Sequence, residues 1–410
     1  MELREGSYFI QNVKALDIAE QFGTPVYVYD ANKILHQLNT LKTAFADVDV
    51  KIKYAVKALS NLSILRLLKK NGSGADVVSI QEAHLALKAG FLPSEIMFSP
   101  NCADFSEIEE AVKLGLVINI DNLPFLKKFG AKYGSSYPCS IRLNPHIMAG
   151  GNIKISTGHS DSKFGISVHQ LAQILDVVKQ YTIKIEGLHI HTGSDITETD
   201  VFLKMADIFF SVAHSFSDLK FIDFGSGFKV SYKEGDKVMD VADLGVKLTE
   251  RFNIFCKQYG RNLELWFEPG KFIVSESGHL LAKTTLIKST PSTTFVGVNT
   301  GLNHLLRPMM YDAYHHILNI SNPTGEQHVY TVVGYICETD TIGAGRKLNE
   351  VSEGDILAIK NAGAYGFSMA SNYNSRLRPA EVLVINDEAK LIRERENFED
   401  LLKGQVEIDL

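Results

Sequence analysis

Residues 171–194, LAQILDVVKQYTIKIEGLHIHTGS, contain the unit that decides the fold. The first half places apolar residues at intervals of three and four, which is typical of an amphipathic helix. The second half, 184–191, is a short apolar run that ends in polar residues and glycine, which is typical of a buried strand. The segment is therefore one helix–strand repeat.

The same alternation extends from about residue 50 to residue 270. We predict eight strands with seven helices between them and an eighth helix around 31–48, before the first strand. Such alternation indicates parallel strands with right-handed crossovers, and eight units close naturally into a (β/α)8 barrel. An open, doubly wound sheet is the alternative on pattern alone. The predicted strands are 51–57, 76–79, 95–99, 116–121, 139–144, 184–191, 221–226 and 264–268.

The rhythm changes after about residue 272, where strand-like runs follow one another without regular helices. These runs include 279–289, 293–299, 328–338, 355–360 and 381–387. They predict a mainly β domain. The run TPVYVYD at 24–30 is another strand, and we expect it to join that β domain. The predicted division is a barrel at 31–272 and a β domain made of 1–30 plus 273–410.

Composition limits the function classes. The chain has 410 residues, 45% of them hydrophobic, and a net charge of −6, which is ordinary for a globular protein. It has no run of about 18 apolar residues, so we expect no membrane span, and it has no long basic stretch, so nucleic acid is not an expected partner. The four cysteines are far apart, which argues against a zinc ribbon and makes a reducing cytoplasm the expected compartment.

Reactive residue types recur at the predicted strand ends, where a barrel places its chemistry. Lys57 ends the first strand, in YAVKA, and Asp76, at the start of the second, could hold it. Burial lowers the pKa of an amine, and the neutral amine can form a Schiff base with an aldehyde. Alone, such a lysine is more often a strand-end side chain that reaches solvent.

A phosphate and a heterocycle are the ligands that the other strand ends suggest. Gly225-Ser226-Gly227 can expose backbone N–H groups to phosphate, with Ser194 nearby; the run lacks the third glycine of a dinucleotide motif, which disfavours NAD. Glu268 could keep a pyridine nitrogen protonated, and His191 could lie against the ring. With Lys57, these residues define a pyridoxal phosphate site, although each alone has a structural interpretation.

Further candidates lie in the predicted β domain. Cys337 and Glu338, in CETD, place a thiol beside a carboxylate. Arg307 and Tyr311, in LLRPMMY, could bind a substrate carboxylate, because guanidinium matches it with two hydrogen bonds. Tyr365 begins a loop rich in small and polar residues, GAYGFSMASNYNSR, and loops of this kind often carry function.

These motifs together resemble the fold-type III pyridoxal phosphate decarboxylases, over roughly residues 24–386. The shared motifs include YAVKA, GADVVS, HIHTGS, DFGSGF, EPGK, LLRPMMYDAYH and ICETD. The stretch from 144 to 167, which is also long enough for a lid, resembles the branch that acts on meso-2,6-diaminopimelate. The resemblance implies a barrel with a β domain, a homodimer with shared active sites, and release of L-lysine and CO2.

The resemblance also implies roles for single residues. Lys57 would carry the cofactor, His191 would stack on its ring and Glu268 would face its nitrogen. The cofactor phosphate would be surrounded by Ser194, Gly225, Gly227, Gly270, Lys271 and Tyr365. The substrate would be bound by Lys271, Arg307, Tyr311, Glu338 and Tyr365. Cys337, supplied by the partner subunit together with Glu338, would donate the proton.

One departure from the family pattern puts a role in doubt. The usual EPGR is EPGK here, so Lys271 keeps the charge but loses the two-pronged guanidinium. Four alternatives stay open at this point. They are a decarboxylase of ornithine, arginine or carboxynorspermidine, an amino-acid racemase, an inactive relative that only binds a partner or stores cofactor, and a sugar-phosphate barrel enzyme without this cofactor.

Overall fold

The computed structural model describes residues 1–147 and 162–410, so most of the stretch at 144–167 lies outside the described residues. The chain separates into two compact units. The barrel unit comprises 35–231 and 237–273, and the β unit comprises 1–34, 232–236 and 274–410. The short segment 232–236, which the sequence places within the barrel, therefore packs with the β unit.

Eight parallel strands close into the predicted barrel, and the open sheet is excluded. Each strand pairs with the next around the ring, and the last, β13, pairs with the first, β5. The strands in ring order are β5 (Val50–Ala55), β6 (Gly74–Val77), β7 (Ile96–Phe98), β8 (Val117–Ile120), β9 (Cys139–Asn144), β11 (Ile185–Ile190), β12 (Phe221–Asp223) and β13 (Glu264–Phe267). A two-residue strand, β10 (Ile166–Ser167), adds to β9.

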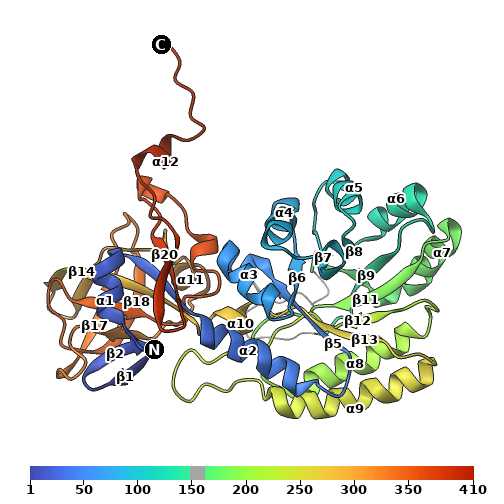
Figure 1. Ribbon diagram of the computed structural model, residues 1–410, viewed down its shortest axis with the longest axis horizontal. Helices are drawn as coiled ribbons and strands as arrows, with labels where there is room; N and C mark the ends of the chain where they lie inside the picture. The colour runs from blue at the N-terminus through green and yellow to red at the C-terminus, as the bar shows by residue number, and fades with distance from the viewer. Residues whose placement is uncertain (148–161) are drawn as a thin grey trace. The chain divides into compact units, whose positions relative to one another are not determined.

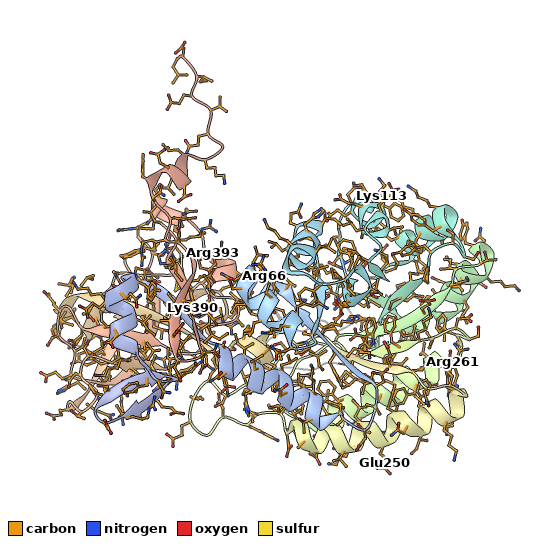
Figure 2. The ribbon with its side chains drawn as sticks, in the orientation of Figure 1. Arg66, Lys113, Glu250, Arg261, Lys390 and Arg393 are labelled. Carbon is orange, nitrogen blue, oxygen red and sulfur yellow. The ribbon has the colours of Figure 1, made fainter. Side chains whose placement is uncertain are left out.

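In the part of the chain that the structure describes, seven helices connect the strands and an eighth precedes them, and Figure 1 shows them around the outside of the barrel. Local signals set their ends: the Ser79 side chain accepts the N–H of Glu82 at the start of one helix, and Gly90 ends it in the left-handed conformation. Charged side chains such as Lys113 and Glu250 extend into solvent from the outer faces (Figure 2). The helices are α2 (Ala31–Ala44), α3 (Leu62–Lys70), α4 (Ile80–Ala89), α5 (Phe105–Lys113), α6 (Leu123–Tyr133), α7 (Leu171–Tyr181), α8 (Thr199–Ala213) and α9 (Val241–Tyr259).

Two strand boundaries differ from the prediction in ways that matter for the site. Strand β5 ends at Ala55, and Lys57 lies on the single 3-10 turn that follows. Strand β6 begins at Gly74, so Asp76 is near its carboxyl end rather than at its start. Both residues therefore sit at the same end of neighbouring strands, which is the end that carries function in this architecture.

The β unit contains the strand predicted at 24–30. Strand β4 (Val26–Asp30) pairs with β14 (Gly278–Ser289) and β20 (Ala380–Ile385), so the N-terminal strand joins the C-terminal sheet as expected. The strand predicted over 328–338 is shorter: β17 (Gln327–Val333) ends first, and Cys337 lies in the loop that follows. The other strands are β1 (Glu2–Arg4), β2 (Ser7–Ile10), β3 (Val13–Lys14), β15 (Thr294–Val298), β16 (Ile317–Asn319), β18 (Thr341–Asn349), β19 (Ile356–Ile359) and β21 (Glu388–Arg393). The helices of the β unit are α1 (Ala15–Phe22), α11 (Arg307–Tyr311) and α12 (Phe398–Leu402), and the short helix α10 (Lys271–Val274) lies at the boundary where the barrel unit ends.

Each unit buries its own apolar surface. Val26, Val28 and Leu281 belong to one cluster in the β unit, and in the barrel unit the rings of Phe221 and Trp266 stack 3.7 Å apart. Among the described residues, no helix is both long and apolar enough to cross a membrane.

Candidate active site

The amine of Lys57 and the carboxylate of Asp76 form an ion pair at the carboxyl ends of β5 and β6. Lys57 Nζ lies 3.1 Å from Asp76 Oδ2. The partners differ in environment, because the Lys57 side chain is 43% exposed and that of Asp76 is 1% exposed. Burial and the nearby Glu268 carboxylate raise the pKa of Asp76, while Lys57 opposes this rise. The Lys57 amine is thus held by a buried carboxylate, while the rest of its side chain remains partly exposed to solvent.

The turn that carries Glu268 packs directly against the turn that carries Lys57. The N–H of Ala55 donates to the carbonyl oxygen of Pro269 at 3.2 Å. A Cβ on Gly270 would lie 3.0 Å from the Ala58 side chain, so glycine permits this close approach. Burial by itself raises the pKa of Glu268, yet the charge and hydrogen bond of His189 and the charge of Lys57 outweigh burial and lower that pKa to about 2. The site therefore holds an ionised carboxylate near the Lys57 amine.

His191 contacts the glycine loop that follows β12. Its Nδ1 accepts the backbone N–H of Ser226 at 3.2 Å. Burial, followed by the charges of Arg142 and Lys57, lowers the pKa of His191 well below its ordinary value. The hydrogen bond and the charges both favour the neutral ring. Gly225 has φ +59°, and a Cβ there would lie 2.7 Å from the Ile190 carbonyl oxygen, so this position requires glycine.

Lys271, which replaces the expected arginine, forms an ion pair with Asp195. Asp195 directly follows Ser194 and has φ +64°. Gly227, at φ +129°, lies on the same side: a Cβ on it would be 2.7 Å from the Gly193 carbonyl oxygen. The two glycine-containing loops after β11 and β12 thus lie against each other, and Lys271 is anchored to the first of them.

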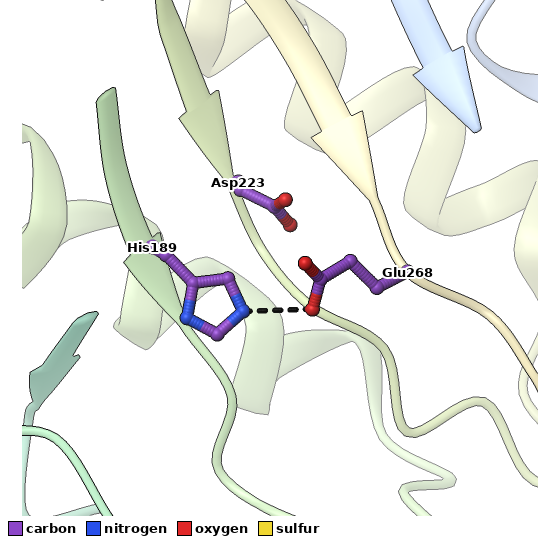
Figure 3. Close-up of side chains that lie close together, drawn as sticks. All are labelled: His189, Asp223 and Glu268. Carbon is purple, nitrogen blue, oxygen red and sulfur yellow. Dashed lines mark hydrogen bonds and ion pairs between the residues drawn. The ribbon is translucent and has the colours of Figure 1, made fainter. Parts of the chain in front are cut away.

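Three buried polar residues of the barrel were not singled out from the sequence: His189, Asp223 and Arg142. Figure 3 shows His189 and Asp223 beside Glu268, with His189 Nε2 2.8 Å from Glu268 Oε2. Arg142, on β9, stacks over the Phe164 ring at 4.7 Å. The sequence did contain a signal for His189. Residues two apart on a strand share a face, and His189 lies two residues before His191.

Cys337 and Glu338 lie in an exposed loop of the β unit and contact the loop that contains Tyr373. The Asn374 side-chain amide donates to Cys337 Sγ at 3.2 Å. The Tyr373 hydroxyl donates to Glu338 Oε1 at 2.8 Å, and this contact raises the pKa of Tyr373 to about 12. The thiol and the carboxylate predicted from CETD are therefore oriented by the Ser- and Asn-rich segment that the sequence marked as functional.

The other predicted site residues of the β unit lie in different surroundings from Cys337 and Glu338. Arg307 is buried at the start of α11, where its Nη2 donates to the Tyr232 hydroxyl at 3.2 Å and its Nε has no hydrogen-bond partner among the described residues. Tyr311 ends the same helix. Tyr365 has φ +57°, which is strained for a tyrosine. No contact of Arg307 or Tyr311 with Cys337 or Glu338 is found within the described part of the β unit.

Comparison with known proteins defines the class. The family model described as pyridoxal-dependent decarboxylase, pyridoxal binding domain, matches residues 31–275. The matched region contains Lys57, Asp76, His191 and Glu268. Fold and site together thus define a pyridoxal-phosphate-dependent decarboxylase.

Full-length relatives narrow the family. The diaminopimelate decarboxylase of Methanothermobacter thermautotrophicus is 36% identical, over 98% of this chain and 96% of that protein. A crystal structure of the enzyme from M. jannaschii has a TM-score of 0.91 at 33% identity and covers 99% of this chain and 98% of that one. A Helicobacter pylori structure, complexed with L-lysine, has a TM-score of 0.86 at 36% identity and covers 95% of this chain and 98% of that one. The chain belongs to the diaminopimelate decarboxylase family.

Proposed function

We propose that this chain decarboxylates meso-2,6-diaminopimelate to L-lysine and CO2, the last step of lysine biosynthesis, with pyridoxal phosphate as cofactor. The observation that carries the proposal is the ion pair of Lys57 with buried Asp76 beside an ionised, buried Glu268. A reactive amine and a carboxylate for a pyridinium nitrogen are what this cofactor requires of a protein.

The described residues fit the cofactor on independent grounds. Glu268 Oε1 and Asp76 Oδ1 are buried and have no hydrogen-bond partner in the described structure. Buried polar atoms are normally paired, so unpaired oxygens at a strand end indicate a bound polar group. The positive φ of Gly225 and Gly227 brings backbone close to His191 and Gly193, and glycine-rich loops of this kind can present backbone N–H groups to phosphate.

The residues divide the chemistry between them. Bound pyridoxal phosphate supplies an electron sink for the bond that loses CO2. Lys57 would hold the cofactor through its Nζ, which Asp76 keeps in place. Glu268 would pair with the ring nitrogen, because an ionised carboxylate stabilises the protonated form. His191 would lie against the ring, and its neutral state would place no second positive charge there.

The phosphate would be held by Ser194, Gly225, Gly227, Gly270 and Tyr365, with Lys271 contributing its charge. Cys337 would supply the proton that replaces CO2 at the substrate Cα. The distal end of the substrate is itself an amino acid. Arg307 and Tyr311 bind its carboxylate, and Glu338 binds its ammonium group. A site that pairs both charges discriminates strongly against analogues that lack one of them.

We also infer a homodimer in which Cys337 and Glu338 serve the partner's barrel. Both side chains are exposed in the single chain, as expected for residues that complete a site only on assembly. We also propose a cytoplasmic location, which the four free thiols support, because free thiols persist in a reducing compartment.

The decisive experiment combines spectroscopy with a substrate panel. The purified chain should absorb in the visible range with pyridoxal phosphate, and borohydride should fix the cofactor to Lys57, as peptide mapping will show. CO2 release should be specific for meso-diaminopimelate over L-ornithine, L-arginine and carboxynorspermidine. Lys57→Ala should lose the covalent cofactor and turnover together.

Each alternative has its own result. Preference for ornithine would replace the substrate and keep the class. Loss of optical activity without CO2 release would indicate a racemase. A coloured chain that turns over no substrate would indicate a binding protein. A colourless chain would favour a barrel enzyme without this cofactor and would contradict the proposal.

A further inference from the structure

A hydrogen-bonded cluster lies buried beneath the carboxyl ends of three adjacent barrel strands. His189 on β11 is paired in register with Asp223 on β12, which is paired with Trp266 on β13. Glu268 follows Trp266 by two residues, so its side chain shares the same face. The His189, Asp223 and Glu268 side chains converge in Figure 3, and one nitrogen or oxygen atom of each lies within 4.8 Å of the others. All three residues are buried, and none exceeds 9% exposure.

The two oxygens of Glu268 have different partners. Oε2 lies 2.8 Å from His189 Nε2. An ionised carboxylate oxygen can only accept, so Nε2 carries the hydrogen and donates it. Oε1 is buried without a hydrogen-bond partner among the described residues. Oε2 is therefore held by His189, whereas Oε1, the oxygen on the side of Asp223 in Figure 3, is buried and keeps its capacity to accept a hydrogen bond.

Asp223 does not compete for the His189 proton donor. Its Oδ1 accepts the backbone N–H of Gly225 at 2.7 Å. Burial, together with repulsion by Glu268, raises the pKa of Asp223 well above its ordinary value, in the opposite direction to that of Glu268. The cluster thus carries its negative charge on Glu268, faced also by Lys57, His191, Asp76 and Arg142.

We propose that His189 is a positioning residue that fixes Glu268 through Oε2 and leaves Oε1 as the atom that faces the ring nitrogen of pyridoxal phosphate. The inference rests on the proposed function and deepens it by assigning a residue beneath the site. Without this donor, the buried carboxylate could rotate or bind a proton, and either change would weaken its pairing with the pyridinium nitrogen. Mutation of a residue that holds a metal ligand in place typically lowers affinity or activity by about 10- to 100-fold, and we expect an effect of similar size for a residue that holds Glu268.

A matched pair of variants tests the hydrogen bond itself. The side-chain amide of glutamine can occupy the position of Nε2, whereas that of asparagine is too short to reach it. His189→Asn should lower kcat by about 10-fold or more with little change in KM, and His189→Gln should restore most of it. Asn119→Leu is the control, because Asn119 is another buried polar residue of the barrel, and its side-chain amide donates to the Ser99 hydroxyl rather than to the cluster.

Two further readouts separate positioning from a merely structural role. Loss of His189 removes a group that lowers the pKa of Glu268, so that pKa should rise in His189→Asn. The acid limb of the kcat profile should then move to higher pH. The apo chain should bind pyridoxal phosphate about 10-fold more weakly, measured by absorbance titration across pH. In Asn119→Leu, both quantities should match the wild type.

The outcomes are distinct. A His189→Asn variant with wild-type kcat, acid limb and cofactor affinity would overturn the inference and leave the proposed function intact. Equal losses in the asparagine and glutamine variants, or in Asn119→Leu, would also overturn it. A wild-type chain that binds no pyridoxal phosphate would contradict both the inference about His189 and the proposed function. Turnover of another amino acid with the same His189 effects would replace the substrate and support the inference.

Discussion

Single buried charges set the chemistry of the barrel site. Glu268 and Asp223 are neighbouring buried carboxyl groups, yet one has its pKa lowered to about 2 and the other has its pKa raised. The difference comes from their surroundings. His189 and Lys57 lower the pKa of Glu268, whereas burial and the charge of Glu268 raise the pKa of Asp223. Two neighbouring carboxylates repel each other, so the ionisation of Glu268 raises the pKa of Asp223.

The raised pKa of Asp223 makes the free energy of unfolding depend on pH in a predictable direction. A native pKa above the unfolded value means that the native state binds more protons, so the contribution of Asp223 is present at low pH and is lost as pH rises. Asp223→Asn removes this dependence. The variant should therefore gain stability relative to the wild type as pH rises from 5 to 8. Urea unfolding of the apo protein at both pH values will measure the difference, and a difference that does not change with pH would contradict a raised pKa of Asp223.

The thiol at position 337 can be tested without disturbing the barrel. Cys337→Ala removes the proposed proton donor, and general acid groups typically contribute about 10²- to 10⁴-fold. We expect kcat to fall by at least about 100-fold, while cofactor absorbance stays at the wild-type level. Cys102→Ala is the control, because Cys102 is the other exposed cysteine. Equal turnover in the two variants would remove Cys337 from the mechanism.

At the scale of elements, the barrel depends on a close approach between β11 and β12. Gly187 lies on β11, and a Cβ there would be 2.1 Å from Cζ of Phe221, whose ring is stacked on Trp266. The ring cannot move away without losing that stacking. Gly187 therefore exists for packing, in contrast to Gly225, which permits a left-handed backbone.

A methyl group at position 187 should destabilise the barrel. Overpacking of a buried site typically costs about 1–3 kcal/mol. We expect Gly187→Ala to lower the free energy of unfolding by that amount, measured in urea. Phe221→Leu should destabilise the wild type, but the double variant should lose less than the sum of the single effects, because the smaller side chain makes room. Strict additivity would show that the contact does not limit packing.

At the scale of the whole molecule, the proposed dimer makes a quantitative prediction. Lys57→Ala and Cys337→Ala should each be nearly inactive, because each lacks one part of every site. After mixing and subunit exchange, random pairing makes half of the dimers mixed, and each mixed dimer has one intact site. Activity should recover to about a quarter of the wild-type value if the sites are shared.

Sedimentation of the same mixture is the control, since exchange requires a dimer. Failure to recover activity in an exchanging dimer would place Lys57 and Cys337 in the site of one chain. A fully active monomer would contradict the shared site altogether.

The sequence alone determined the barrel, the β domain and the cofactor class. Period-two and helical patterns are local, and the motifs around Lys57, His191 and Glu268 occur at strand ends that any closed barrel brings to one face. Strand ends were less accurate, because pairing with neighbours decides where a strand stops. Lys57 thus moved from a strand to a turn, and Asp76 from the start of a strand toward its end.

Only the tertiary structure revealed the cluster under the site. His189 and Asp223 come from segments 34 positions apart, and although alternation places His189 two residues before His191, nothing local shows that His189 and Asp223 meet. Their contacts with Glu268 arise because three strands align in register, and the ionisation of that carboxylate depends on charges gathered from the whole barrel mouth. Charge interactions act through space at short range, so the chain must fold before they exist.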